Sequence, residues 1–109
     1  VGLIVQVRKI VDESFPGWVE CSFVDARGTE HLLVEKIPVV CEEQIDANTP
    51  LPRRGFVACL EVGRRDDSGR TIVSIDTGRP WGIASTSGAI RFDVTADQLT
   101  FLQLGEPTT

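Results

Sequence analysis

Residues 56–76 read FVACLEVGRRDDSGRTIVSID, and this stretch decides the fold class that the sequence predicts. Apolar side chains alternate with other side chains on both sides of its centre, which is the period-two pattern of β-strands with one buried face. The central Asp66-Asp67-Ser68-Gly69 has turn chemistry, because Asp accepts hydrogen bonds within its own turn and Gly adopts positive φ. The stretch is therefore predicted to be one long β-hairpin with a four-residue loop.

The apolar pattern also predicts the strand register of this hairpin. A four-residue loop places Val62 opposite Val73 and Leu60 opposite Ile75. A shift of one residue would set Val62 opposite Ser74 and turn the apolar set to the wrong face. The residues predicted to be buried here and in the segment that follows are Leu60, Val62, Val73, Ile75, Ile83 and Phe92.

Two further segments have the same form, with apolar strands joined by four residues that end in Gly. The first pairs 18–24 with 29–36, and the second pairs 81–83 with 90–94. Gly28, Gly69 and Gly88 close the three loops and are predicted to have positive φ. In this register Cys21 faces Leu32.

Outside the hairpins, the pattern predicts a first strand over 3–11, a helical turn over 42–48 and a short last strand or turn within 99–104. Thr95-Ala96-Asp97-Gln98 has the form of a capping box. Seven or eight strands in so short a chain either close on themselves or stack as two sheets, because otherwise their edges stay open. We expect an all-β domain over residues 1–104, a small closed or partly open antiparallel β-barrel with a two-sheet β-sandwich as the alternative, followed by a flexible tail over 105–109.

Composition narrows the classes of function. The 109 residues carry a net charge of -5, and such a surface repels phosphate backbones, which disfavours nucleic acid as a partner. No apolar run approaches the roughly 18 residues of a membrane span, and the start of the chain lacks the layout of a signal peptide. Three widely spaced cysteines indicate reduced thiols, so we expect a cytoplasmic location and no membrane association.

Catalytic, metal and cofactor signals are sparse. His31 is the only histidine, and the predicted register sets it opposite Ser22, on the other face from Cys21. Cys21, Cys41 and Cys59 lack the short spacing of zinc ligands and are expected not to converge. No phosphate-binding or nucleophile-elbow motif occurs. The sequence therefore predicts no metal, no cofactor and no enzyme activity.

Asp76-Thr77-Gly78 resembles the Asp-Thr-Gly motif of retroviral-type aspartic proteases, in which two carboxylates share a proton. In that family the motif lies early, with a flap and a second core motif after it. Here only 31 of the 109 residues follow Gly78, and Arg79-Pro80-Trp81 replaces the usual continuation. A strand end with an Asp turn explains the tripeptide better, and a protease acting through Asp76 is the least favoured hypothesis.

Two sets of residues are candidates for binding. Six of the eleven basic residues gather around the central hairpin: Arg53, Arg54, Arg64, Arg65, Arg70 and Arg79. They suggest a patch for an acidic partner or a phosphate, although arginines at hairpin ends also serve to blunt sheet edges. Trp18 and Trp81 each follow a turn, and Trp is enriched at interface hot spots as well as in core packing.

Three phrases, PGWVE at 16–20, EKIPVV at 35–40 and RPWGI at 79–83, resemble a group of small uncharacterised bacterial proteins of similar length. That resemblance implies a bacterial cytoplasmic origin and carries over no activity or functional residue.

Three hypotheses follow. The leading one is a non-catalytic module that binds another protein, as a regulator, an adaptor or an immunity-like protein does. The alternative is a β-barrel that binds a small ligand or nucleic acid through the arginine-rich hairpin. The third is the Asp76 enzyme. The sequence leaves the oligomeric state open.

Overall fold

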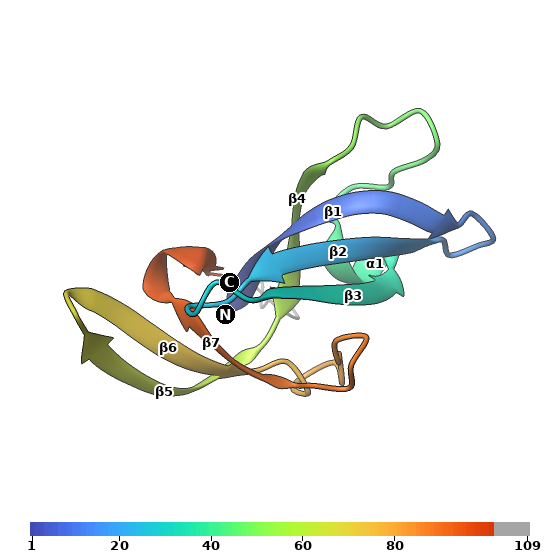
Figure 1. The fold of residues 1–109 in the computed structure, drawn as a ribbon. Coiled ribbons are helices and arrows are strands. Elements are labelled where there is room, and N and C mark those ends of the chain that lie inside the picture. Colours follow the sequence, from blue (N-terminus) through green and yellow to red (C-terminus); the bar gives the residue numbers. More distant parts are fainter. Residues whose placement is uncertain (102–109) are drawn as a thin grey trace, which may run out of the picture.

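The computed structural model describes residues 1–101, and within them the chain forms eight β-strands, a short α-helix and a 3-10 helix (Figure 1). The elements are β1 (Gly2–Asp12), β2 (Trp18–Val24), β3 (Glu30–Lys36), α1 (Ile37–Val40), β4 (Arg53–Ala58), β5 (Leu60–Asp67), β6 (Arg70–Asp76), β7 (Arg91–Thr95), the 3-10 helix η1 (Ala96–Gln98) and β8 (Leu99–Thr100). The tail expected over 105–109 and the end of the last strand, 102–104, lie outside the described residues.

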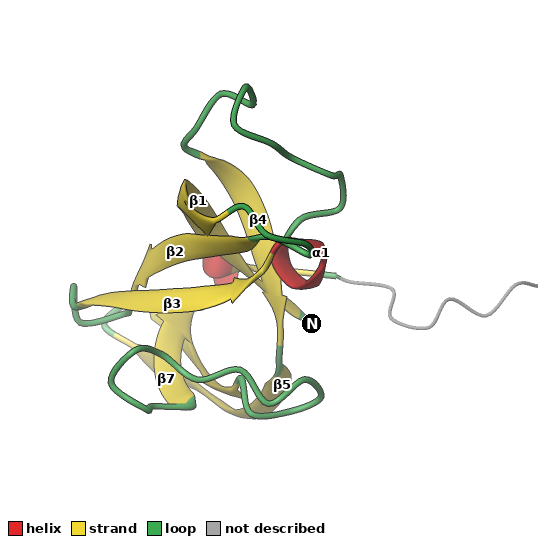
Figure 2. Ribbon diagram, turned by 90° about the vertical axis from the view of Figure 1, so that its right-hand side faces the viewer, coloured by secondary structure: helices red, strands yellow, loops and turns green. Residues whose placement is uncertain are grey.

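The strands form two antiparallel sheets. One has the order β3-β2-β1-β4, with β8 pairing beside β2 on β1, and the other has the order β5-β6-β7. Figure 2 shows the first sheet above the second, with α1 beside β3 and β4. The all-β prediction is confirmed, and over residues 1–101 the two sheets do not join into a closed barrel.

The hydrophobic core lies between the two sheets. Alternate residues of β1 turn inward, so Leu3, Val5 and Val7 are almost fully buried while Gln6 and Arg8 are exposed. The other buried side chains of this core include Val19, Cys21, Leu33, Ile37, Val40, Val57, Val73, Ile75, Ile83, Phe92 and Val94. The core therefore takes one face from each sheet and the apolar side of α1.

The predicted long hairpin is divided between the two sheets. β4 ends at Ala58 in the first sheet, and β5 begins at Leu60 in the second. Between them, the Cys59 N–H donates to the Val1 carbonyl at 2.9 Å, and the amino terminus donates to the Cys59 carbonyl at 3.3 Å. Cys59 thus stays beside the start of the chain while the next residue leaves to pair with β6.

The predicted register of this hairpin is wrong. Asp67 pairs with Arg70, so the loop is Ser68-Gly69 alone, with φ of 52° and 83°. Positive φ at both central residues is the geometry of two-residue hairpin turns of type I′, which match the twist of the strands. A bulge between Glu61 and Gly63 then shifts the pairing again.

The bulge changes which side chains are buried. Leu60 and Val62 are 43% and 39% exposed, contrary to the prediction. Val73, Ile75, Ile83 and Phe92 are buried as predicted.

The β2–β3 hairpin is shifted by one residue from its prediction. Cys21 pairs with Leu33, and His31 pairs with Phe23 rather than with Ser22. The Gly28 N–H donates to the Asp25 carbonyl and the Asp25 N–H donates to the Thr29 carbonyl. This is a tight turn followed by a left-handed glycine, since φ of Gly28 is 87°. The positive φ predicted for Gly28, Gly69 and Gly88 is confirmed.

The third predicted hairpin is absent from the described chain, because 81–83 form no strand and β7 pairs instead with β6. The helical turn predicted over 42–48 is also wrong. Helix α1 spans Ile37–Val40, where Pro38 in the first turn needs no N–H partner. The capping box predicted at Thr95–Gln98 is confirmed at the start of η1.

Hydrogen bonds join the sheets on the side away from Cys59. The Ala26 N–H donates to the Asp93 carbonyl of β7 at 2.8 Å, and the Thr86 N–H donates to the Leu32 carbonyl of β3 at 2.8 Å. The Gln98 amide donates to the Val24 carbonyl at 2.7 Å. These contacts position the β2–β3 turn against the second sheet, where the candidate site lies.

The division of the hairpin can be tested by truncating its side chains. Ile75→Ala should lower the free energy of unfolding by about 2–5 kcal/mol, because it empties space in the core. Leu60→Ala should lower it by clearly less, about 1 kcal/mol or under, because Leu60 is 43% exposed and lies outside the core. Urea unfolding of both variants measures the difference, and equal losses would contradict the exposed position of Leu60.

A close approach between β4 and α1 provides a second test. A Cβ added at Gly55 would lie 2.6 Å from Cγ2 of Val7 and 2.7 Å from the Val40 carbonyl oxygen. Gly55→Ala should therefore destabilise the fold by about 1–3 kcal/mol through overpacking. Gly63→Ala is the matched control, since its Cβ would meet Ser74 at an ordinary 3.7 Å. Thermal unfolding that affects both variants equally would contradict this packing.

Candidate functional site

The six arginines singled out from the sequence do not form one free basic patch. Four of them form ion pairs: Arg53 with Glu43, Arg64 with Glu61, Arg65 with Asp93 and Arg79 with Asp76. Arg70 donates to the Ala26 carbonyl at 2.9 Å, and Arg54 lies on β4 in the other sheet without an ion pair to any described residue. The arginine-rich hairpin is therefore largely neutralised by its own chain.

The two tryptophans have different surroundings. Trp18 begins β2 and is half-buried, with the Lys36 ammonium 5.2 Å from its ring centroid. Trp81 lies in the loop between β6 and β7 and is 58% exposed. Of the two, Trp81 is the one that presents a large apolar surface to solvent.

The loop that carries Trp81, residues 77–90, is held by two buried anchors. Thr77 is fully buried, and its hydroxyl donates to the Ile83 carbonyl at 2.6 Å. Ile83 is buried in the core, and its N–H donates to the Thr77 carbonyl at 3.0 Å. The loop therefore has a defined shape although it contains no regular secondary structure.

Asp76 holds the base of this loop to β7. Its carboxylate is almost fully buried, accepts the Gly78 N–H at 2.8 Å, and pairs with Nε of Arg91 at 3.3 Å and Nε of Arg79 at 3.4 Å. Burial raises the pKa of Asp76, but the Gly78 hydrogen bond and the two guanidiniums outweigh it and lower the pKa below its ordinary value. A carboxylate paired in this way differs from the proton-sharing pair of an aspartic protease.

A cleft of about 430 Å³ lies where the β2–β3 turn meets the second sheet. Its walls combine apolar and charged side chains from both sheets. They are Asp25, Arg27, His31, Val62, Ser74, Ile75, Ala89, Arg91, Phe92 and Asp93. This volume lies within the roughly 300–1,000 Å³ of small-molecule sites.

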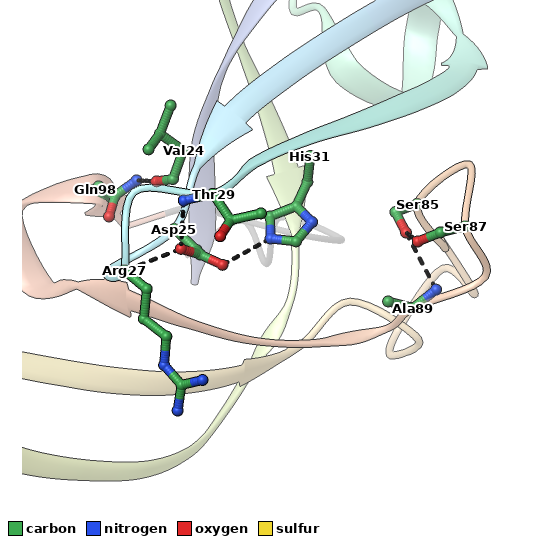
Figure 3. Close-up of polar contacts among 9 residues, drawn as sticks. All are labelled: Val24, Asp25, Arg27, Thr29, His31, Ser85, Ser87, Ala89 and Gln98. Atoms are coloured by element: carbon green, nitrogen blue, oxygen red, sulfur yellow. Dashed lines mark hydrogen bonds and ion pairs between the residues drawn. The ribbon is translucent and has the colours of Figure 1, made fainter.

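Asp25 and His31 form a fixed pair on one wall of the cleft (Figure 3). Nε2 of His31 lies 2.8 Å from Oδ2 of Asp25, and Oδ1 accepts the N–H groups of Arg27 at 2.9 Å and Thr29 at 3.0 Å. The other ring nitrogen, Nδ1, points away from Asp25. Burial raises the pKa of Asp25, but the hydrogen bonds from His31 and the turn lower it below its ordinary value.

Aromatic rings pack around this pair. The His31 ring centroid lies 5.2 Å from that of Phe23 and 4.8 Å from that of Phe92. Phe23 and Phe92 pack edge to face at 5.1 Å. His31 is therefore held by Asp25 on one side and by two aromatic side chains on the others.

No family model, curated protein or solved structure matches the chain. The site must therefore be interpreted from its own geometry.

Asp93, whose carbonyl accepts the Ala26 N–H, also lines the cleft. It accepts the Ser74 hydroxyl at 2.7 Å and pairs with Arg65 at 3.2 Å. The hydrogen bond from Ser74 lowers the pKa of Asp93, Arg65 and Arg27 lower it further, and burial opposes them. Both carboxylates of the cleft are thus ionised and already have hydrogen-bond partners.

The described residues contain no nucleophile bonded to His31. The Ser85 hydroxyl lies 2.9 Å from that of Ser87 and accepts the Ala89 N–H, away from His31 in Figure 3. All three cysteines are free, and burial raises the pKa of Cys21 to about 12 and that of Cys59 to about 11. These thiols are protonated and poorly nucleophilic at neutral pH.

Metal-ligating clusters and membrane-spanning helices are both absent from the described residues. No group of three His, Cys, Asp or Glu residues within 1–101 lies close enough together to hold a metal ion. No helix in that part of the chain is long and apolar enough to cross a membrane.

Several charged residues that line the cleft were not predicted from the sequence. Asp25, Arg27 and Arg91 were not singled out, and His31 was placed on the wrong face. The signal was present in Asp25-Ala26-Arg27-Gly28, because Asp at the first position and Gly at the fourth are typical of a type I turn. A left-handed glycine after such a turn gives a three-residue loop, which would have placed His31 opposite Phe23.

The pairing of Asp76 predicts a pH-dependent contribution to stability. Because its pKa is lowered on folding, the stabilisation exists above the unfolded pKa of about 3.9 and is lost as pH falls through the folded value. Asp76→Asn should therefore unfold at a lower temperature than the unmodified chain at pH 7. The difference between their unfolding temperatures should become smaller as pH falls below about 4.

Glu13→Gln is the control for this comparison, since Glu13 is exposed and forms no ion pair with a described residue. Thermal unfolding between neutral and acidic pH measures both variants. If the difference in unfolding temperature between Asp76→Asn and the unmodified chain stays constant across this range, the role of the carboxylate charge is contradicted.

Proposed function

We propose that this chain is a non-catalytic protein-binding module whose contact surface is centred on Trp81. The supporting observation is that an ordered loop, anchored by Thr77 and Ile83 in the interior, leaves Trp81 58% exposed. Loops longer than about 12 residues without secondary structure are uncommon in compact domains and usually functional. The loop at 77–90 lies between Asp76 and Arg91, and so has fourteen residues.

The anchoring of the loop favours binding. A loop already held in one shape loses little conformational entropy when a partner docks on it. Tryptophan buries a large area on binding and dominates many interfaces for that reason. An exposed Trp on a rigid support is therefore suited to act as an anchor residue.

Charge next to Trp81 indicates the chemistry of the partner. Arg79 and Arg91 share the single carboxylate of Asp76, and their side chains are 61% and 64% exposed. Two cations against one anion leave a local positive charge at Asp76, at the base of the loop that carries Trp81. We propose a partner protein that presents an apolar pocket with acidic groups at its rim.

Nucleic acid is a weaker proposal. Four of the six arginines chosen from the sequence are engaged with carboxylates, so few guanidiniums are free for phosphates. The net charge of -5 also opposes binding to a polyanion. A bacterial cytoplasmic origin stays a prediction from the sequence.

Two exposed aromatic residues allow a matched test of the binding surface. A partner would be captured from bacterial lysate with the unmodified chain, identified by mass spectrometry, and its affinity measured with purified proteins by calorimetry. Trp81→Ala should weaken binding by about 2 kcal/mol or more, which is roughly 30-fold. Phe15→Ala, which removes a 98% exposed ring from the β1–β2 turn, should leave the affinity unchanged.

Circular dichroism would establish that both variants fold. A purified complex that loses affinity with Phe15→Ala and keeps it with Trp81→Ala would place the interface elsewhere. Failure of every captured protein to bind the purified chain would reject the proposed function.

A further inference from the structure

We propose that the cleft between the β2–β3 turn and the second sheet binds a small organic monoanion, a carboxylate with an apolar body. The site uses Arg27 and Arg91 for the carboxylate and the apolar wall for the body. The proposal does not depend on a protein partner at Trp81.

The apolar wall of the cleft is open to solvent mainly at Val62. Ile75 and Phe92 form its buried part, and Ala89 and Val62 extend it. Val62 lies at the β5 bulge, where it is 39% exposed although it lines the cleft. A ligand that covers Val62 would remove apolar surface from water, which is favourable by about 25 cal/mol per Å².

The two carboxylates of the cleft, Asp25 and Asp93, are already engaged in hydrogen bonds within the chain. Asp25 accepts hydrogen bonds from two backbone N–H groups and lies 2.8 Å from His31. Asp93 accepts the Ser74 hydroxyl and pairs with Arg65. Both carboxylates therefore already have hydrogen-bond partners within the chain.

Arg27 and Arg91 have guanidinium donors that are available to a ligand. Arg27 forms no ion pair with another described residue, and Figure 3 shows its side chain extending from the turn without a partner among the residues drawn. Arg91 uses Nε for Asp76, while its side chain stays 64% exposed. The site thus offers guanidinium donors whose hydrogen bonds are incomplete.

The charges around the cleft indicate that its ligand is an anion. Arg27 and Arg91 line the cleft, Arg65 and Arg79 pair with Asp93 and Asp76 beside it, and Arg70 donates to the Ala26 carbonyl of the same turn, so the positive charges around the cleft exceed the negative charges of Asp25, Asp76 and Asp93. An anionic ligand reduces this excess of positive charge. Inorganic phosphate has no apolar body to cover Val62, so the apolar wall favours an organic anion.

Geometry also favours a carboxylate. The planar guanidinium fork donates two parallel hydrogen bonds to a carboxylate. The His31 side chain is 20% exposed and packs on the buried Phe92 ring with 4.8 Å between their centroids, so it gives the wall a small aromatic surface suited to a flat body. An aromatic acid fits both requirements.

The probe for the test is benzoate, titrated into the ¹⁵N-labelled chain and followed by amide chemical shifts. Shifts should concentrate at Arg27, His31, Val62 and Phe92, with a dissociation constant near about 1 mM for so small a probe. Benzamide, which has the same shape without the charge, should bind at least about tenfold more weakly. Inorganic phosphate should also bind more weakly than benzoate.

Two arginine variants distinguish the cleft from general charge effects. Arg27→Gln should weaken benzoate binding at least about tenfold, because it removes the unpaired guanidinium. Arg54→Gln is the matched control, since Arg54 also forms no ion pair with a described residue but lies on β4, outside the cleft. It should bind benzoate as the unmodified chain does.

Several outcomes would overturn the proposal. One is the absence of localised shifts up to about 10 mM benzoate, a concentration that would nearly saturate the expected site. Others are equal binding of benzamide, tighter binding of phosphate, or an equal effect of the two arginine variants.

Discussion

The hydrogen bond from the Ala26 N–H to the Asp93 carbonyl, 2.8 Å long, holds the β2–β3 turn against β7. The chain itself joins the two sheets on the other side, at Cys59. Between these two connections the inner faces of both sheets are covered and the core can form. The same contact brings Asp25, Arg27 and His31 from one sheet beside Phe92 and Asp93 of the other, so the cleft exists because this turn docks here.

Turn chemistry recurs at the two places where this molecule offers a surface for binding. In both Asp25–Thr29 and Ser85–Ala89 the first residue donates its backbone N–H to the carbonyl of the fifth residue. The side-chain oxygen of the first residue accepts the N–H of the fifth residue. A left-handed glycine stands at the fourth position of each. One turn builds a wall of the cleft, and the other lies in the loop that presents Trp81, so rigid turns support both proposed sites.

The charge at the site depends on which side chains lie close together in the fold and differs from the net charge of the chain. Asp76 pairs with Arg79, three residues on, and with the more distant Arg91, while Asp93 pairs with Arg65 of another strand. The acidic chain thereby acquires a small region of positive charge. Composition indicates an acidic surface, and sequence clustering indicates a basic hairpin. The structure shows why neither describes the site: most of the hairpin arginines are paired, while Arg27, far from that cluster in sequence, is not.

The all-β class, the glycine positions with positive φ, the capping box and the burial of Val73, Ile75, Ile83 and Phe92 follow from sequence alone, because alternation and turn residues act over a few neighbours. The change of sheet at Cys59, the pairing of β7 with β6 and the position of His31 do not, because each depends on contacts between distant segments. One-residue differences in loop length set the register and exchange the faces of a strand. The sequence by itself therefore determined the kind of fold, and only the tertiary structure decided which side chains meet in the cleft.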